Sequence, residues 1–173
     1  MSYRKCKAVF FDRDGIINER LSGDRVVTTW KEFRFIPDVF RILRFIKSRG
    51  YLTILTTNQS AIAGRLMTEQ QLLEIHDQMQ YVLELNDCPF DHIFYCPHDI
   101  QDGCSCRKPS PGLLMTAELY HPIDKANSYM VGHSDEDMEA GRSYGIKTIR
   151  VGKWDAAADY SVANLDDILH III

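Results

Sequence analysis

Two acids at the end of the first apolar segment, Asp12 and Asp14, have the residue type and spacing that catalysis requires. They follow residues 8–11, a short apolar run typical of a buried strand, and Gly15 lets the backbone turn directly afterwards. Two carboxylates two residues apart in an extended backbone point the same way, and a bound cation would balance them. One acid can then attack as a nucleophile while the other transfers protons. An Asp-rich surface turn is the ordinary alternative.

A second polar strand end begins at Thr57, where Thr57, Asn58, Gln59 and Ser60 follow one another after an apolar run. Hydroxyl and amide donors of this kind suit the oxygens of a phosphate group. A polar strand end with an asparagine turn is also common without a function. Its meaning therefore depends on whether the other polar segments reach the same place.

Four potential metal ligands occur within eleven residues: Cys96, His98, Cys104 and Cys106. This order of three cysteines and one histidine fits a closed, tetrahedral zinc site. Zinc would order a long loop that has no apolar core of its own. Cys6 and Cys88 have no such partners nearby in the sequence, so we expect them to be structural.

A basic pair, Arg107 and Lys108, follows directly after the last of these cysteines, and Pro109 and Pro111 stiffen the chain behind it. A lysine can neutralise a nucleophilic carboxylate and a phosphate, and an arginine can hold a second phosphate or hydroxyl group. A solvated basic pair is the ordinary alternative. Because the predicted zinc site would fix the backbone just before the pair, we expect both cations at the site of the two acids.

A further polar segment contains His133, Asp135, Glu136 and Asp137, and it follows the predicted strand 128–131. His133 and Asp137 are candidate metal ligands. Acids in the first turn of a helix also stabilise the helix dipole, which is enough to explain Asp135 and Glu136.

Strands and helices alternate along the whole sequence, which predicts an α/β fold with a parallel, Rossmann-like sheet between two layers of helices. The candidate site segments all follow predicted strands, so they should meet at the carboxyl edge of that sheet. Residues 37–49 have a helical apolar period, and a capping box at Thr68 begins another helix, on which we expect His76 to be partly exposed. Residues 21–30 predict a flap or small hairpin, with no large cap domain, and a closing helix should begin near residue 164.

The composition indicates an ordinary globular protein, with 173 residues, 45% of them hydrophobic and 25% charged. We predict a single domain over residues 1–173. The net charge of −4 argues against nucleic acid or an acidic membrane as the main partner, and no apolar run reaches the roughly 18 residues that span a bilayer. No signal peptide is predicted, and the odd number of five cysteines indicates metal binding in a reducing compartment, so we expect a cytoplasmic protein.

The segments FFDRDGIIN, TTNQS and CSCRKPSPG resemble the motifs of the haloacid dehalogenase superfamily of phosphatases, and the likeness covers nearly the full chain. Within that superfamily the chain looks most like the capless, zinc-containing heptose bisphosphate phosphatases and their histidinol-phosphate phosphatase relatives.

This resemblance implies a role for each candidate residue. Asp12 would be the nucleophile that forms an aspartyl-phosphate, and Asp14 would protonate the leaving oxygen and then activate water. Thr57 and Lys108 would offset charge on the transferred group. The implied substrate-binding residues are Arg13, Asn58, Gln59, Ser60 and Arg107. The implied ligands of Mg²⁺, or of Mn²⁺ or Co²⁺, are Asp12, Asp14, His133 and Asp137. The implied ligands of Zn²⁺ are Cys96, His98, Cys104 and Cys106.

At one position the chain departs from the family pattern, because His133 stands where the family usually has a metal-binding aspartate. An imidazole suits Mn²⁺, Co²⁺ or Zn²⁺ better than Mg²⁺. Three outcomes follow: the metal moves toward Asp137 or Asp135, a softer ion is preferred, or catalysis is weak. The sequence favours the first.

The activity that the resemblance implies is hydrolysis of a sugar bisphosphate such as D-glycero-D-manno-heptose 1,7-bisphosphate at one phosphate. Histidinol phosphate is the alternative substrate. A zinc-stabilised binding module, with weak or lost activity owing to His133, is an alternative of another class. We expect a small phosphorylated substrate, no nucleic-acid or membrane partner, and a monomer.

Overall fold

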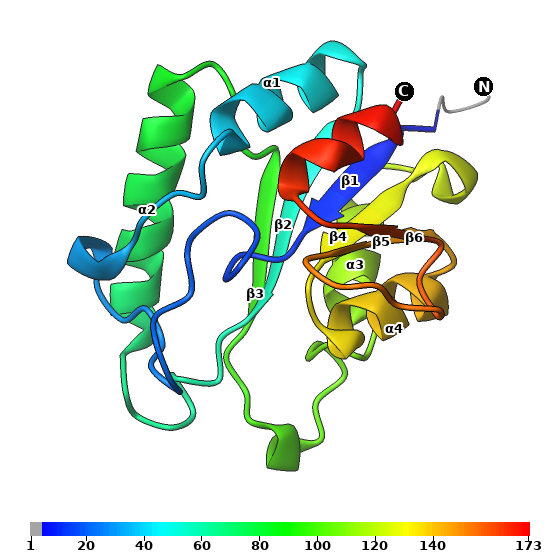
Figure 1. Cartoon of the computed structure of the whole chain (residues 1–173). Coiled ribbons are helices and arrows are strands. Elements are labelled where there is room, and N and C mark those ends of the chain that lie inside the picture. The colour runs from blue at the N-terminus through cyan, green and yellow to red at the C-terminus, as the bar shows by residue number, and fades with distance from the viewer. Residues whose placement is uncertain (1–4) are drawn as a thin grey trace.

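The computed structural model describes residues 5–173, which form a six-stranded, fully parallel sheet in the order β3-β2-β1-β4-β5-β6 (Figure 1). The strands are β1 (Ala8–Phe11), β2 (Leu52–Asn58), β3 (His92–Cys96), β4 (Tyr129–Gly132), β5 (Lys147–Val151) and β6 (Tyr160–Val162). The register places Phe10 opposite Ile54 on one side and Met130 on the other. Because all pairs are parallel, every strand delivers its carboxyl end to one edge, which confirms the predicted fold class.

Helices cover both faces of the sheet, as the buried residues of its two hydrophobic cores show. The α-helices are α1 (Val39–Ser48), α2 (Glu69–Leu85), α3 (Gly112–Thr116) and α4 (Asp135–Tyr144). The 3-10 helices are η1 (Trp30–Glu32), η2 (Ile100–Asp102), η3 (Ala117–Leu119), η4 (Lys125–Asn127) and η5 (Leu165–His170). One core joins α1, α2 and η5 to the sheet, and the other joins α3 and α4 to its opposite face. None of the helices in the described residues is long and apolar enough to cross a membrane.

Local sequence explains where the site-bearing helices begin. In α2 the side chain of Thr68 caps the helix and Gln71 returns the bond, which confirms the predicted capping box. In α4 the corresponding pair is Ser134 and Asp137, and Gly145 ends the helix with a positive φ of 89°. The start of α4 is therefore fixed by Asp137, one of the candidate site residues.

Of the two alternatives for residues 21–30, a flap or a small hairpin, the structure shows the flap: residues 21–29 form an irregular loop before η1 that pairs with no strand in the described residues. The closing helix begins near residue 164 as predicted, with Asn164 as its N-cap, and it is the 3-10 helix η5. One expectation was wrong, because His76 is not partly exposed: only 3% of its surface is accessible, since α2 turns it toward the sheet.

Candidate active site

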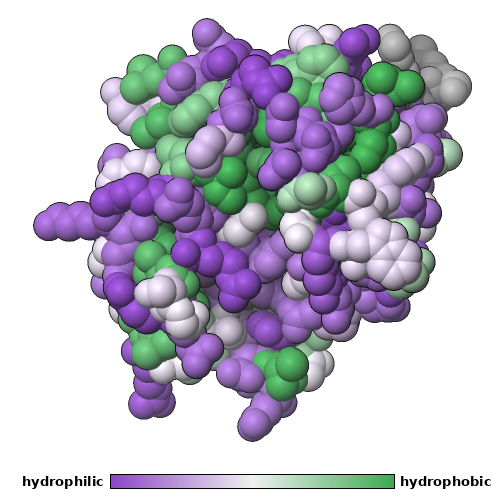
Figure 2. All heavy atoms as spheres, viewed as in Figure 1, coloured by the Kyte–Doolittle hydropathy of each residue, from purple (hydrophilic) through white to green (hydrophobic). Residues whose placement is uncertain are grey.

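The predicted site segments meet in one cavity of about 360 Å³ at the carboxyl edge of the sheet. Its wall is formed by residues that follow β1, β2 and β4, by the basic pair after the cysteine loop, and by the loop 20–27. Of the predicted residues it includes Asp12, Asp14, Asn58, Ser60, Arg107, Lys108, His133 and Asp137. Figure 2 shows a hollow near the middle of the molecule, surrounded mainly by hydrophilic residues, with apolar residues gathered above it.

Lys108 lies at the electrostatic centre of this cavity. Its buried Nζ donates to Asp12 Oδ1 at 3.0 Å, to Asp137 Oδ1 at 2.6 Å and to the carbonyl oxygen of Thr56 at 2.8 Å. Burial alone would lower the pKa of Lys108, but the two carboxylates outweigh burial and raise that pKa above its ordinary value. Lys108 is therefore a fixed positive charge beside Asp12, as the sequence predicted.

Asp14 is held from three sides by side chains that donate hydrogen bonds. Arg13 Nη2 reaches both carboxylate oxygens at 2.9 and 3.0 Å, Asn18 Nδ2 reaches Oδ1 at 3.0 Å, and Gln59 Nε2 reaches Oδ2 at 2.9 Å. Burial would raise the pKa of Asp14, but Arg13 and the two amides outweigh it and hold that pKa below its usual value. The resting group is thus a carboxylate, the form that can accept a proton from water.

Arg13 lies behind Asp14 rather than in the cavity wall, which differs from the substrate-binding position that the sequence predicted. Its side chain is fully buried and its Nη1 is 3.3 Å from Nε2 of His76. Burial and the guanidinium lower the pKa of His76 to about 3, so this imidazole is neutral at pH 7. The buried Arg13 cation, which contacts the neutral His76 on its other side, therefore orients Asp14.

Thr57 and Gln59 lie beneath the cavity rather than in its wall. Thr57 Oγ1 accepts a bond from Gln59 Nε2 at 2.9 Å, and the same nitrogen reaches Asp14. Thr57, at 1% exposure, presents its hydroxyl to Gln59, and the two residues form part of the support of Asp14.

Asn58 positions the lysine from the neighbouring strand. Its Nδ2 donates to the carbonyl oxygen of Lys108 at 2.9 Å, and its Oδ1 accepts from the Lys108 N–H at 3.0 Å. This pair of bonds joins β2 to the basic segment 50 residues away. Asn58 thus fixes the backbone from which Lys108 enters the site, while Ser60 faces the cavity.

Asp137 is saturated by donors within the protein. Its Oδ1 accepts from Lys108, and its Oδ2 accepts from the backbone N–H groups of His133 and Ser134 at 3.1 and 3.0 Å and from Ser134 Oγ at 2.7 Å. Burial would raise its pKa, but Lys108 and Ser134 outweigh burial and lower it. Asp137 is an anion that binds Lys108 and caps α4 at the same time.

His133 faces the predicted nucleophile. Its Nδ1 is 3.4 Å from Asp12 Oδ2 and 3.9 Å from Asp137 Oδ2, and it is buried with no hydrogen-bond partner in the described residues. Asp12, His133 and Asp137 together could hold a metal ion, since one donor atom from each lies within 4.8 Å of the others.

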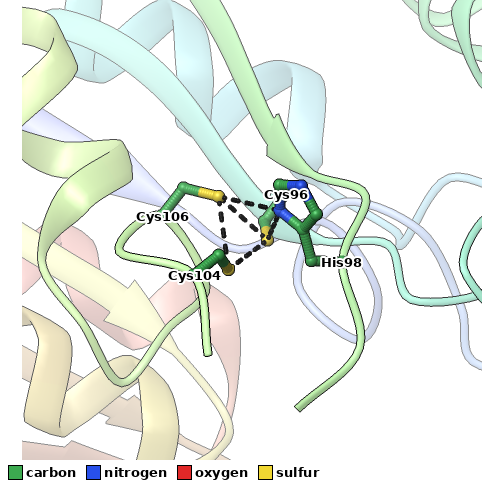
Figure 3. A group of neighbouring side chains, drawn as sticks. All are labelled: Cys96, His98, Cys104 and Cys106. Carbon is green, nitrogen blue, oxygen red and sulfur yellow. Dashed lines mark hydrogen bonds between the residues drawn. The ribbon is translucent and has the colours of Figure 1, made fainter. Parts of the chain in front are cut away.

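The four predicted zinc ligands point toward one another (Figure 3): Cys96, His98, Cys104 and Cys106. Neighbouring donor atoms are 3.2–3.6 Å apart. Donors at ordinary zinc distances on a tetrahedron are about 3.5–3.8 Å apart, so small movements would fit the cluster to a four-coordinate ion. The loop between His98 and Cys104 contains η2, and Asp99 caps the N-terminus of this 3-10 helix.

Sequence reasoning missed the arginines that the loop after β1 brings to the cavity, Arg20 and Arg25. Arg25 is paired with Glu32 at 3.1 Å, whereas Arg20 makes no ion pair within residues 5–173. The carbon stem of Arg20 lies against Gly15: a Cβ added there would be 3.2 Å from Arg20 Cδ and 3.3 Å from His133 Nδ1. The predicted flap over the site was the only sequence feature that indicated that residues of this loop would reach the cavity.

The arrangement suits phosphoryl transfer to a carboxylate. Asp12 and Asp14 both line the cavity, Lys108 offsets the charge of Asp12, and the Asp14 carboxylate could accept a proton. The lysine and a divalent cation can together stabilise the negative charge of a transferring phosphate.

Comparisons with known proteins agree with this chemistry. A family model described as HAD-hydrolase-like matches residues 105–167. The D-glycero-beta-D-manno-heptose-1,7-bisphosphate 7-phosphatase of Vibrio cholerae is 36% identical, over 96% of this chain and 96% of its own. The Escherichia coli K12 protein of the same name is 38% identical, over 93% of this chain and 91% of its own. A crystal structure of D,D-heptose 1,7-bisphosphate phosphatase from B. bronchiseptica, complexed with magnesium and phosphate, has a TM-score of 0.86 at 27% identity and covers 96% of this chain and 97% of that one.

Proposed function

We propose, from the premise that this chain belongs to the haloacid dehalogenase-like phosphatases, that it hydrolyses one phosphate of D-glycero-D-manno-heptose 1,7-bisphosphate. The names of the relatives specify the 7-phosphate of the β-anomer, and we propose the same reaction here. The haloacid dehalogenase-like phosphatases are phosphoric monoester hydrolases, and members of this family use Mg²⁺.

The distribution of charge in the cavity carries this proposal. Asp12 and Lys108 are joined at 3.0 Å, where one phosphate would react, while three arginines line the same cavity: Arg20, Arg25 and Arg107. Arg107 is loosely paired with Glu136 at 3.8 Å, and its Nε has no partner in the described residues. A second phosphate could bind Arg20, which has no ion pair within residues 5–173, and Arg107, whose ion pair is loose, while Arg25 stays with Glu32. A monoester would leave Arg20 and Arg107 unused.

The proposed reaction uses Asp12, Asp14 and one water molecule. Asp12 attacks phosphorus, the bond from phosphorus to the sugar oxygen breaks, and the protein carries an aspartyl-phosphate. Asp14 gives the leaving oxygen its proton and then takes a proton from the water that hydrolyses the acyl phosphate. Because Arg13 and two amides hold the pKa of Asp14 low, Asp14 takes its first proton from solvent as the phosphate arrives. The proton that it later takes from the hydrolytic water restores the acid for the next cycle.

The donor atoms near Asp12 fit a divalent cation, because His133 Nδ1 is buried without a hydrogen-bond partner in the described residues and lies beside Asp12 Oδ2. We propose that Asp12 and His133 hold this ion, with Mg²⁺, Mn²⁺ or Co²⁺ as candidates. When bound, it would offset charge on the phosphate oxygens.

We also propose that Cys96, His98, Cys104 and Cys106 bind one structural Zn²⁺. The ion would fix the loop that ends in Arg107 and Lys108, so it would act on catalysis through the position of those cations. Cysteine thiolates of this kind persist in a reducing compartment, which supports a cytoplasmic enzyme.

Phosphate release from several esters tests the proposal. With Mg²⁺ or Mn²⁺ present, we expect kcat/KM for the heptose bisphosphate to exceed that for histidinol phosphate and p-nitrophenyl phosphate. The Arg20→Gln variant should lose about 10- to 100-fold with the bisphosphate, because one charge-assisted hydrogen bond is lost. Arg25→Gln is the matched control, since Glu32 already engages that arginine. Faster turnover of histidinol phosphate, or no release from any ester, would contradict the proposal.

A further inference from the structure

We infer that His133 Nδ1 is a direct ligand of the catalytic cation, and that this nitrogen shifts the selectivity of the site from Mg²⁺ toward Mn²⁺ or Co²⁺. Asp12 Oδ2 is its partner ligand. This inference concerns the chain's own donor atoms and does not depend on which phosphate ester is hydrolysed.

Most carboxylate oxygens of the three acids near Lys108 and Arg13 already accept hydrogen bonds. Asp137 accepts four hydrogen bonds, which occupy about all the lone pairs of a carboxylate. Asp14 also accepts four, from Arg13, Asn18 and Gln59. In Asp12, Oδ1 accepts from Lys108, and Oδ2 accepts no hydrogen bond from the described residues. Among these three acids, Asp12 Oδ2 is therefore the oxygen left for a metal.

An unpaired nitrogen, His133 Nδ1, faces this oxygen. His133 Nδ1 is inaccessible to solvent and has no hydrogen-bond partner, although Asp12 Oδ2 is only 3.4 Å away. An unpaired buried nitrogen costs free energy, so its position needs an explanation. Two ligands at about 2.1 Å from a metal lie about 3.0 Å apart on an octahedron and about 3.4 Å apart on a tetrahedron. The two atoms are spaced as ligands of one ion.

The backbone around His133 keeps the imidazole in this position. The backbone N–H of His133 donates to Asp137 Oδ2, so the helix cap that fixes α4 also fixes His133. On the other side Gly15 makes room, because a Cβ at that position would lie 3.3 Å from His133 Nδ1. Strand β4 ends at Gly132, directly before the ligand. The imidazole is held between two rigid elements, β4 and α4, as a metal ligand requires.

This geometry replaces the outcome that the sequence favoured, in which the metal moves toward Asp137 or Asp135. The oxygens of Asp137 are engaged, and Asp135 is 86% exposed and paired with Arg150 at 2.7 Å. Mg²⁺ prefers oxygen ligands, whereas imidazole nitrogen suits the first-row transition metals. A site built from one carboxylate and one imidazole should therefore discriminate against Mg²⁺ more strongly than a site built from two carboxylates.

Pulsed EPR of the zinc-replete, full-length protein loaded with Mn²⁺ tests this inference directly. We expect a nitrogen hyperfine coupling from a bound imidazole, which changes when the histidines carry ¹⁵N and disappears in His133→Asp. His170→Gln, at an exposed site, should keep the coupling. The wild-type measurement with and without ¹⁵N stands alone, so the inference stays testable if the variant fails to fold.

Calorimetry gives a second readout that is independent of activity. In His133→Asp we expect the ratio of the Mg²⁺ to the Mn²⁺ dissociation constant to fall about 10-fold, because an oxygen replaces the nitrogen. Absence of a nitrogen coupling in the wild-type protein, or an unchanged ratio in the variant, would overturn the inference. Loss of phosphatase activity with the coupling intact would instead count against the proposed function alone.

Discussion

Replacing His76 by glutamine should remove part of the acid sensitivity of the fold. His76 is 3% exposed on α2, and burial together with Arg13 lowers its pKa to about 3. In the unfolded chain a histidine has a pKa of about 6.5. Between these two pH values the unfolded state binds a proton that the native state excludes, so the free energy of unfolding falls as the pH falls below about 6.5.

The magnitude follows from these two pKa values. At pH 5 the unfolded state gains about 2 kcal/mol from protonating this one histidine, and above pH 8 it gains almost nothing. His76→Gln removes that term, whatever constant change in stability the substitution brings at pH 8. A protonated His76 would also face Arg13 at 3.3 Å, so the same proton would loosen the support of Asp14.

Urea unfolding at pH 8 and at pH 5 measures the effect. We expect the wild type to lose about 2 kcal/mol more than His76→Gln between the two values. His170→Gln, at an exposed site near the C-terminus, should behave as the wild type does. Equal losses in the wild type and in His76→Gln would refute the claim that His76 is kept neutral by burial and by Arg13.

Three further substitutions test the supports of the site. Asp137→Ala should destabilise the protein by about 3–5 kcal/mol in urea unfolding, because it leaves the buried Lys108 with one carboxylate partner and removes one half of the capping box of α4. A cost below about 1 kcal/mol would mean that Asp137 is not the buried anion described here. Gly132→Ala should lower the free energy of unfolding by about 1–3 kcal/mol, because its Cβ would overlap the carboxylate of Asp137, whereas the control Gly64→Ala, with no contact closer than 3.5 Å, should lower it less. Equal losses of stability in the two variants would contradict this packing. Cys104→Ser should lower the zinc content measured by atomic emission and reduce kcat/KM, while the control Cys6→Ser should change neither quantity. Full zinc retention in Cys104→Ser would exclude the proposed ligand set.

The sequence allowed the sheet and most of the site to be predicted because both depend on local patterns. Short apolar runs that end in polar residues mark strand ends, and parallel strands bring those ends together, which places Asp12 beside Lys108 across 96 residues. The cysteine spacing likewise predicted a cluster that the structure assembles.

What could not be predicted depends on contacts between distant residues. The family resemblance implied that Arg13 binds substrate, but the buried Arg13 side chain instead contacts His76, which is 63 residues away in the sequence. Asn58 looked like a phosphate donor, and its amide instead holds the backbone of Lys108 from 50 residues away. The flap carries no periodic pattern, so Arg20 could not be placed against Gly15 without the fold.

The most direct measurement of the central claim is to trap the phosphorylated protein. A turnover mixture quenched rapidly in acid and reduced with borohydride converts an acyl phosphate at an aspartate to homoserine, which peptide mass spectrometry locates. We predict homoserine at position 12 in the wild type, and none in Asp12→Asn, which should also release no phosphate while keeping its fold and zinc. Homoserine at another position, or rapid phosphate release by Asp12→Asn, would contradict the assignment of Asp12 as the nucleophile.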